Sequence, residues 1–268
     1  MLLEKSNALV LGASGGLAQA LIAQFLADTT IDTVIAVSSK PAPVSVHAER
    51  SLLWIHTEYQ EPAMHEVVEK LKDYSGTISR VCICHGLLHT DNLWPEKRLE
   101  DIKAEALQEI FQANAVVPAL WLKLLHRVLK SKQPAVVAAL SARVGSIGDN
   151  RLGGWYAYRS SKSALNMLLQ NIAIEYARRV KNVKLISFHP GTTDTALSKP
   201  FQATVPEGKL FTPEFVAERL TGIMDNKMMS NPDPKFLEEM RDEARKTNKK
   251  YAKLLDVQES ASITCVKP

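Results

Sequence analysis

The chain has 268 residues, 46% of them hydrophobic, and a formal net charge of +4. That length fits one large α/β domain or two small ones, and the apolar fraction is enough for a buried core. The charge is spread along the chain, whereas nucleic-acid binding usually needs a concentrated basic stripe, so we expect no nucleic-acid partner. No apolar run reaches membrane-spanning length and no signal-peptide layout precedes the first apolar strand, so we expect no membrane association.

Cysteine usage indicates a reducing compartment. The three cysteines are Cys82, Cys84 and Cys265, and so sparse and odd a set argues against a disulfide framework. Cys82 and Cys84 alternate within an apolar run, which favours buried strand thiols over a metal site. We therefore predict a cytoplasmic protein without a bound metal.

A glycine-rich turn follows the first apolar run, Ala8 to Leu11, and precedes a helix predicted to end near Ala27. Glycines let a phosphate approach the backbone, and the helix N-terminus supplies free N–H groups and the positive end of a dipole. A plain strand-to-helix turn is the alternative, but the strand–turn–helix context favours a dinucleotide phosphate site. The residues we expect to form it are Gly12, Ser14, Gly15, Gly16 and Leu17.

The second apolar run, Thr33 to Val37, ends in Ser38, Ser39 and Lys40. An acidic residue at this place would hold the adenosine ribose hydroxyls of NAD, and none is present. Small hydroxyls and a lysine suit a 2′-phosphate, so NADP is the predicted cofactor and NAD is less favoured. Lys40 as a solvated loop residue is the alternative. Thr57, just after the third apolar run, is expected near the adenine.

Strands and helices are predicted to alternate along most of the chain. Further strands are expected at 52–55, 80–84, 134–140 and 183–188, with helices at 62–73, about 104–130, up to about 179, and from 212 onward. This alternation predicts a Rossmann-type doubly wound parallel sheet with helices on both faces, in a single α/β domain. We assign residues 1–225 to that domain and 226–268 to a charged C-terminal extension, with a helix at 234–255 and a short strand at 262–266.

A tyrosine and a lysine stand four residues apart in the predicted helix before residue 179. Tyr158 and Lys162 would therefore lie on one helix face, about one turn apart. A phenol titrates near ~10, and a neighbouring ammonium favours the phenolate and lowers that pKa. Such a pair can exchange a proton with a carbonyl or alcohol oxygen near neutral pH. An exposed tyrosine beside a solvated lysine is the alternative for this spacing alone.

Together these motifs resemble the short-chain dehydrogenase/reductase family over about residues 6–222. Residues 12–18 match its phosphate turn, with Ala18 in place of the usual third glycine, and Asn114 matches its helix asparagine. Tyr158 and Lys162 match its catalytic pair. Residues 84–86 stand where members usually have Asn-Ala-Gly, and residues 190–195 match its nicotinamide-contacting turn. The stretches 143–156 and 209–214 resemble the C-factor branch, some of whose members are linked to cell–cell signalling.

The resemblance implies hydride transfer between the nicotinamide and a small carbonyl or alcohol substrate. Tyr158 would give the oxygen its proton, Lys162 would lower the pKa of Tyr158 and hold the ribose hydroxyls, and Asn114 would fix a water that links Lys162 to solvent. A homodimer or homotetramer is expected, formed partly through the helices after Asn114 and Lys162. The strand-end turns would add cofactor contacts from Cys84, His85, Gly86, Pro190, Gly191, Thr193 and Thr195.

The catalytic serine is where the sequence departs most from that family. Members usually place it three residues before the glycine that matches Gly145, and that position is Ala142 here. Ser141 is one step earlier, and a one-residue offset at a strand end turns a side chain to the other face. We take Ser141 as the first candidate and Ser146 as the second. The competing hypothesis is a dinucleotide-binding signalling protein of C-factor type with vestigial catalysis, which Ala142 supports and the intact Tyr158–Lys162 pair opposes.

Overall fold

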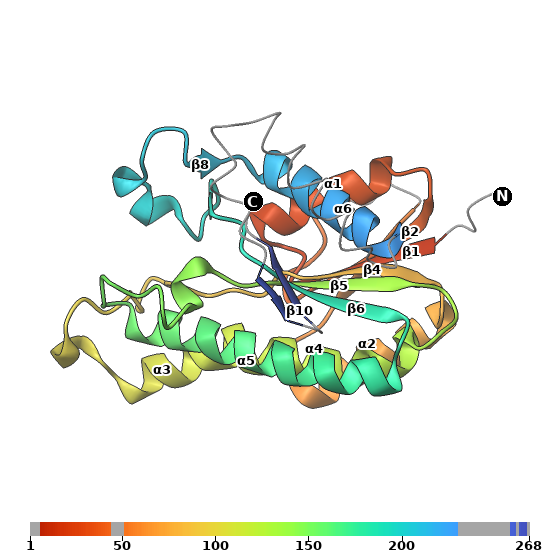
Figure 1. Ribbon diagram of the computed structural model, residues 1–268, viewed down its shortest axis with the longest axis horizontal. Coiled ribbons are helices and arrows are strands. Elements are labelled where there is room, and N and C mark those ends of the chain that lie inside the picture. The colour runs from red at the N-terminus through yellow and green to blue at the C-terminus, as the bar shows by residue number, and fades with distance from the viewer. Residues whose placement is uncertain (1–5, 44–50, 230–257, 261–262, 267–268) are drawn as a thin grey trace.

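A computed structural model describes residues 6–43, 51–229, 258–260 and 263–266. Its centre is one sheet with the strand order β3-β2-β1-β4-β5-β6-β10-β9, in which only the β9–β10 pair is antiparallel (Figure 1). The order reverses direction between β1 and β4, which is where doubly wound sheets bind ligands. The strands are β1 Ser6–Leu11, β2 Ile31–Ser38, β3 Leu52–His56, β4 Ile78–Ile83, β5 Ala135–Leu140, β6 Val183–Phe188, β9 Gln258–Ser260 and β10 Ile263–Val266.

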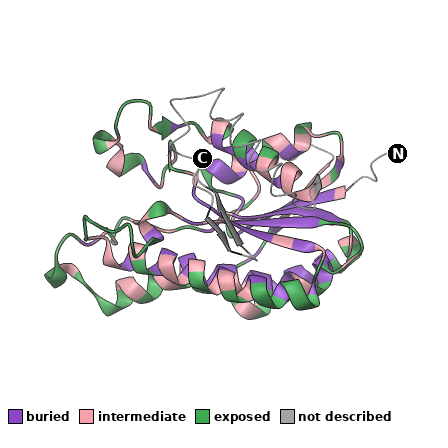
Figure 2. Cartoon of the chain, viewed as in Figure 1, coloured by how far each residue is buried: buried purple, intermediate pink, exposed green. Residues whose placement is uncertain are grey.

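Helices cover both faces of this sheet, which confirms the predicted fold class. Figure 1 shows α1 (Gly16–Ala27) and α6 (Pro213–Met229) on one face, with α2 (Glu61–Leu71), α4 (Val117–Leu129) and α5 (Tyr156–Arg179) on the other. Successive strand residues point to opposite faces of the sheet and so belong to two separate hydrophobic cores. Leu9 and Leu11 pack toward α2, α4 and α5, whereas Ala8 and Val10 pack toward α1 and α6. The central strands are accordingly buried on both sides (Figure 2).

The long helix predicted at 104–130 is instead three segments. It consists of α3 (Ala104–Phe111), a π-helix (Gln112–Val116) and α4. Pro118, near the start of α4, has no N–H to donate to the preceding turn, and π-turns of this kind are frequent at functional sites. The correction matters because Asn114 stands inside the π-helix.

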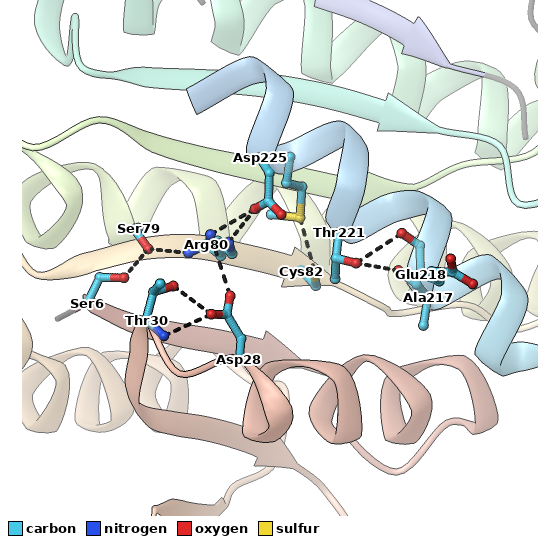
Figure 3. A network of polar contacts seen from close by, with 11 residues as sticks. Ser6, Asp28, Thr30, Ser79, Arg80, Cys82, Ala217, Glu218, Thr221 and Asp225 are labelled. Atoms are coloured by element: carbon cyan, nitrogen blue, oxygen red, sulfur yellow. Dashed lines mark hydrogen bonds and ion pairs between the residues drawn. The ribbon is translucent and has the colours of Figure 1, made fainter. Parts of the chain in front are cut away.

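Strand β4 begins before the predicted 80–84 and ends at Ile83, and the arginine within it is buried. The Arg80 side chain is 7% exposed, and its Nε and Nη2 atoms donate to Asp225 Oδ1 at 3.0 and 2.8 Å. Asp28 Oδ2 lies 3.7 Å from Arg80 Nη2. Figure 3 shows this cluster joining β4 to α6 and to the turn after α1. A buried cation needs such partners, so the cluster fixes these elements together.

The C-terminal part of the chain contributes to the sheet. Strand β10 pairs in parallel with β6, and β9 pairs with β10. Helix α6 runs through residues 225 and 226, so the boundary placed between them stays a prediction. The charged helix predicted at 234–255 lies outside the described residues. Within the described residues, no helix is both long enough and apolar enough to span a membrane.

Candidate active site

The predicted catalytic pair lies in the first two turns of α5, beside the carboxyl ends of β4 and β5. Tyr158 and Lys162 are 8% and 2% exposed, and Lys162 Nζ lies 5.9 Å from the centre of the Tyr158 ring. The ammonium donates a hydrogen bond to the Leu140 carbonyl at the end of β5, at 2.9 Å. The two side chains therefore share one buried face of the helix, as their spacing predicted.

Burial sets the protonation of this pair. It raises the pKa of Tyr158 to about 12 and lowers the pKa of Lys162 to about 8. The sequence had predicted that the lysine lowers the pKa of the phenol. In the free protein desolvation is the larger effect, since it penalises both charged forms. The phenol is therefore protonated at neutral pH.

Asn114 acts as a clamp between three parts of the site. It is fully buried, its Oδ1 accepts the Leu87 N–H at 2.7 Å, and its Nδ2 donates to the Leu87 carbonyl at 2.8 Å. The same amide donates to Ser161 Oγ at 3.1 Å. The π-helix thereby holds the loop after β4 and the residue that precedes Lys162.

The structure places Ser141 with other partners than Tyr158. Its hydroxyl, 4% exposed, donates to Asn166 Oδ1 at 2.7 Å, and Ser187 Oγ donates to the same oxygen at 3.0 Å. Asn166 lies one helical turn beyond Lys162. Ser146 is exposed, and its N–H closes a short 3₁₀ helix, Arg143–Gly145, on the Arg143 carbonyl. Ala142 is half-buried in extended conformation, so its side chain turns away from that of Ser141.

Gly145 has a structural role that sequence reasoning missed. A Cβ atom at this position would lie 2.8 Å from both the carbonyl carbon and the Cβ of Lys162. Ser163 Oγ also donates to the Gly145 carbonyl at 2.7 Å. The turn after β5 therefore rests directly on α5, at the residue that carries the ammonium.

The predicted phosphate turn lies at the start of α1. Gly12 has φ +78°, and a Cβ there would lie 3.1 Å from the backbone of Cys84 and His85. The N-cap of α1, Gly15, has no side-chain cap, so helix N–H groups are left for a ligand. Ser14, Gly15 and Gly16 are exposed, whereas the Leu17 side chain is in the core. A Cβ on Gly16 would lie 3.1 Å from Thr195 Cγ2, which brings the two predicted cofactor turns together.

The turn after β6 carries a buried hydroxyl without a partner. Pro190 and Gly191, whose φ is +72°, lead into β7 (Thr192–Thr193), which pairs with β8 (Leu210–Phe211). Thr193 Oγ1 is buried, and no group in the described chain hydrogen-bonds to it. Ser198 Oγ donates to the Thr193 carbonyl at 2.6 Å. A buried polar atom needs a partner, and a cofactor amide would supply one, so these residues fit a nicotinamide.

The predicted 2′-phosphate residues differ in availability. Ser38 is fully buried and its hydroxyl accepts the Lys40 N–H at 3.0 Å. Ser39 and Lys40 are exposed, and the Ser39 N–H donates to the Tyr59 hydroxyl at 3.1 Å. Thr57 donates to the Glu58 carbonyl at 3.1 Å. Ser39 and Lys40 are therefore the groups open to a ligand, and Tyr59 is a support that sequence reasoning missed.

His85 is held as a neutral ring. Trp121 Nε1 donates to His85 Nε2 at 3.0 Å, and Tyr59 packs edge-on at 4.3 Å between ring centres. The proton of the neutral ring is therefore on Nδ1. Burial, and then the charge of Lys162, lower the pKa of His85 to about 3. Next along the chain, a Cβ on Gly86 would lie 3.9 Å from Lys162 Nζ.

Aromatic rings from three segments gather beside Tyr158. The Trp155 ring lies 6.1 Å from Tyr158 and 5.0 Å from Phe201, which belongs to the short 3₁₀ helix Lys199–Thr204. Phe201 in turn lies 6.0 Å from Trp94 and 5.6 Å from His89, both on the loop 87–103. The short helix Lys199–Thr204 and the loop 87–103 thus meet beside the start of α5. The spacing of residues along the sequence could not predict this contact, because the three segments are distant in sequence.

Comparisons with known proteins identify the family. The short chain dehydrogenase family matches residues 6–206, so the chain belongs to it. It is 24% identical to benzil reductase ((S)-benzoin forming) of Bacillus cereus over 81% of this chain and 93% of that one. Similarity to the C-signal protein of Myxococcus xanthus is partial, at 32% identity over 40% of this chain and 63% of that one. The NADPH-bound carbonyl reductase from chicken fatty liver has the same fold, with TM-score 0.70, 19% identity, and coverage of 84% and 92%.

The neutral state of His85 predicts a pH dependence of stability. Because its folded pKa is about 3 and an unfolded histidine titrates near ~6.5, the unfolded chain binds more protons between these values. The free energy of unfolding should therefore fall as pH drops below ~6.5, by up to about 1.4 kcal/mol per pH unit from this residue. Urea unfolding from pH 7 to 4.5 should show a weaker fall in His85→Gln, which keeps an acceptor for Trp121. The control His65→Gln, at an exposed site, should follow the wild type. Equal slopes in His85→Gln and wild type would contradict the assignment.

Proposed function

We propose that this short-chain dehydrogenase/reductase reduces a small-molecule carbonyl with NADPH, and that Tyr158 gives the proton. The arrangement that carries the proposal is the buried Tyr158–Lys162 pair at the sheet edge where the glycine turn and the Thr193 turn meet. When bound, the reduced nicotinamide supplies a hydride to the carbonyl carbon.

A protonated phenol is the form that reduction requires. With its pKa raised to about 12 by burial, Tyr158 keeps its proton until a carbonyl oxygen gains negative charge and takes it. Lys162 lies close enough to stabilise the phenolate that remains, and we propose that it also holds the ribose hydroxyls. Asn114 fixes the backbone on both sides of this pair, and we propose that its Oδ1, with a second lone pair, holds the water expected there.

Cofactor choice follows from the exposed end of β2. Ser39 and Lys40 offer a hydroxyl and a cation to a 2′-phosphate, and no acidic residue stands there to bind a ribose diol. We expect NADPH to bind at least about tenfold more tightly than NADH, since hydrogen bonds to charged groups contribute about 1.5–3 kcal/mol. Fluorescence titration would measure both dissociation constants. Lys40→Ala should reduce the ratio of the NADH to the NADPH dissociation constant. Lys70→Ala, which changes an exposed lysine on α2, should leave that ratio unchanged. Tighter binding of NADH than of NADPH by the wild type would refute the preference.

The role of Tyr158 is testable by removing one oxygen. Tyr158→Phe should reduce turnover by about 10²–10⁴-fold, the usual contribution of a general acid, and leave the NADPH dissociation constant nearly unchanged, because the phosphates bind at the glycine turn. Tyr156→Phe, two residues earlier on the same helix, is the matched control and should keep its activity. Comparable loss of cofactor binding in Tyr158→Phe would show that Tyr158 is structural instead. Steady-state kinetics and NADPH titration provide both readouts.

The hydrogen bonds of Ser141 change our assignment of the serine role. Its hydroxyl already serves Asn166, so we propose that Ala142 occupies the serine position and that the site works without that donor. Ser141→Ala should then change turnover by less than about threefold, whereas Ala142→Ser should raise it, since one oxyanion donor is worth up to about 10²–10³-fold. Steady-state kinetics of Ser141→Ala, Ala142→Ser and Ser146→Ala, measured with the same ketone, would distinguish these assignments. A large loss in Ser141→Ala or in Ser146→Ala would return the role to that residue.

A signalling role without catalysis is the second candidate, favoured by Ala142 and by the partial similarity to C-signal. It would be supported if NADPH bound but no ketone, aldehyde or quinone were reduced.

The homodimer or homotetramer stays a prediction. Met167 and Ile174 on α5 are exposed and apolar at 63% and 40%, as a subunit contact would require, and light scattering would measure the mass.

A further inference from the structure

The helix that carries Tyr158 begins without a cap of its own. Gly153, Gly154 and Trp155 have φ values of +64°, +63° and +51°, so three successive residues are left-handed before α5. Trp155 is the N-cap and its side chain makes no capping hydrogen bond. The first N–H groups of a helix need partners from elsewhere, and Tyr158 is only the third residue of this one. The position of its phenol depends on how that turn is held.

Glu96, from the loop 87–103, supplies the missing cap. Both carboxylate oxygens accept the Ala157 N–H, at 3.3 and 3.2 Å, and the Glu96 carbonyl accepts the Trp155 N–H at 2.6 Å. The residue is 4% exposed. A carboxylate is rarely buried without compensation. In the described chain no lysine or arginine pairs with it, so the Ala157 N–H and the positive end of the α5 dipole stabilise the carboxylate.

The same loop contributes to the aromatic cluster beside Tyr158. Trp94, two residues before Glu96, belongs to the ring cluster that reaches Tyr158 through Phe201 and Trp155. On the other side of Glu96, the N–H groups of Lys97 and Arg98 donate to Asp101 Oδ2 at 3.1 and 3.0 Å. The loop is thus ordered next to Glu96. Glu96 is the point at which this loop is hydrogen-bonded to the catalytic helix.

We infer that Glu96 is a positioning residue: it fixes the first turn of α5 against the substrate loop and thereby sets where the Tyr158 hydroxyl lies. The inference rests on the proposed function. It assigns Glu96 no contact with substrate or cofactor. Because proton transfer requires a hydrogen-bond distance to the carbonyl oxygen, a displaced first turn slows turnover while the phosphate and nicotinamide contacts persist.

The test compares Glu96→Ala with Glu96→Gln in the full chain. Glu96→Ala should lower kcat by tenfold or more, on the order expected for a misplaced catalytic group, with the NADPH dissociation constant within about twofold of wild type. Glutamine still presents an oxygen to the Ala157 N–H, so Glu96→Gln should retain kcat within about threefold. Wild-type kcat in Glu96→Ala, or a parallel loss of NADPH binding, would overturn the inference.

Two neighbouring glycines provide a matched pair that leaves the carboxylate in place. Gly153→Ala and Gly154→Ala strain the same left-handed backbone, but only at Gly154 would the added Cβ meet the Glu96 carbonyl, at 3.3 Å; at Gly153 nothing lies within 4 Å. The Gly154 variant should therefore lose more kcat than the Gly153 variant. Equal losses would mean that backbone strain alone, and not the contact with Glu96, controls Tyr158.

Hydrogen exchange separates failure of this inference from failure of the proposed function. The Ala157 amide should be protected in the wild type and lose protection in Glu96→Ala, whether or not any carbonyl is reduced. A wild type that binds NADPH but reduces no carbonyl would overturn the function alone. Unchanged protection of Ala157 in Glu96→Ala would overturn the inference alone.

Discussion

Lys162 places an ammonium group inside the protein, where it is 2% exposed. Burying such a charge costs several kcal/mol unless hydrogen bonds replace the water it loses. The Leu140 carbonyl accepts one hydrogen bond from the ammonium and so replaces part of the lost hydration. Burial lowers the pKa of the lysine to about 8. An ammonium has three donors, and Leu140 uses one. Among the described residues, two donors are thus left for acceptor oxygens such as the ribose hydroxyls that we propose Lys162 holds.

The backbone around Lys162 is fixed from several directions. Gly145 allows the turn after β5 to rest on the helix at that residue, where any side chain would collide. Asn114 bonds to Ser161 on one side and to Leu87 on the other, and so joins the helix to the loop after β4. The charge thus lies in a part of the fold with little freedom to relax around it.

Features encoded in local spacing were predictable. The strand–glycine–helix order of residues 8–27 specified the turn between β1 and α1, because glycine and a helix start act within a few residues of each other. The four-residue separation of Tyr158 and Lys162 specified a shared helix face. Features that depend on distant partners were not: the π-helix at Asn114, the hydrogen bond of Ser141 to Asn166 and the cap from Glu96 each join elements far apart in the chain. The raised pKa of Tyr158 likewise depends on burial, which spacing does not give.

The absence of a serine at Ala142 changes what the remaining groups must do. In the proposed reaction the developing negative charge on the carbonyl oxygen meets the Tyr158 hydroxyl without a second side-chain donor from that position. The exact position of the Tyr158 hydroxyl then matters more for the reaction, because a single hydrogen bond loses strength steeply as its length and angle depart from the optimum. Three left-handed residues before α5, without a side-chain cap, do not by themselves hold the Tyr158 hydroxyl in one position. In the proposed reaction the buried carboxylate of Glu96, which accepts the Ala157 N–H from the loop that also carries Trp94, supplies the rigidity that the local sequence lacks.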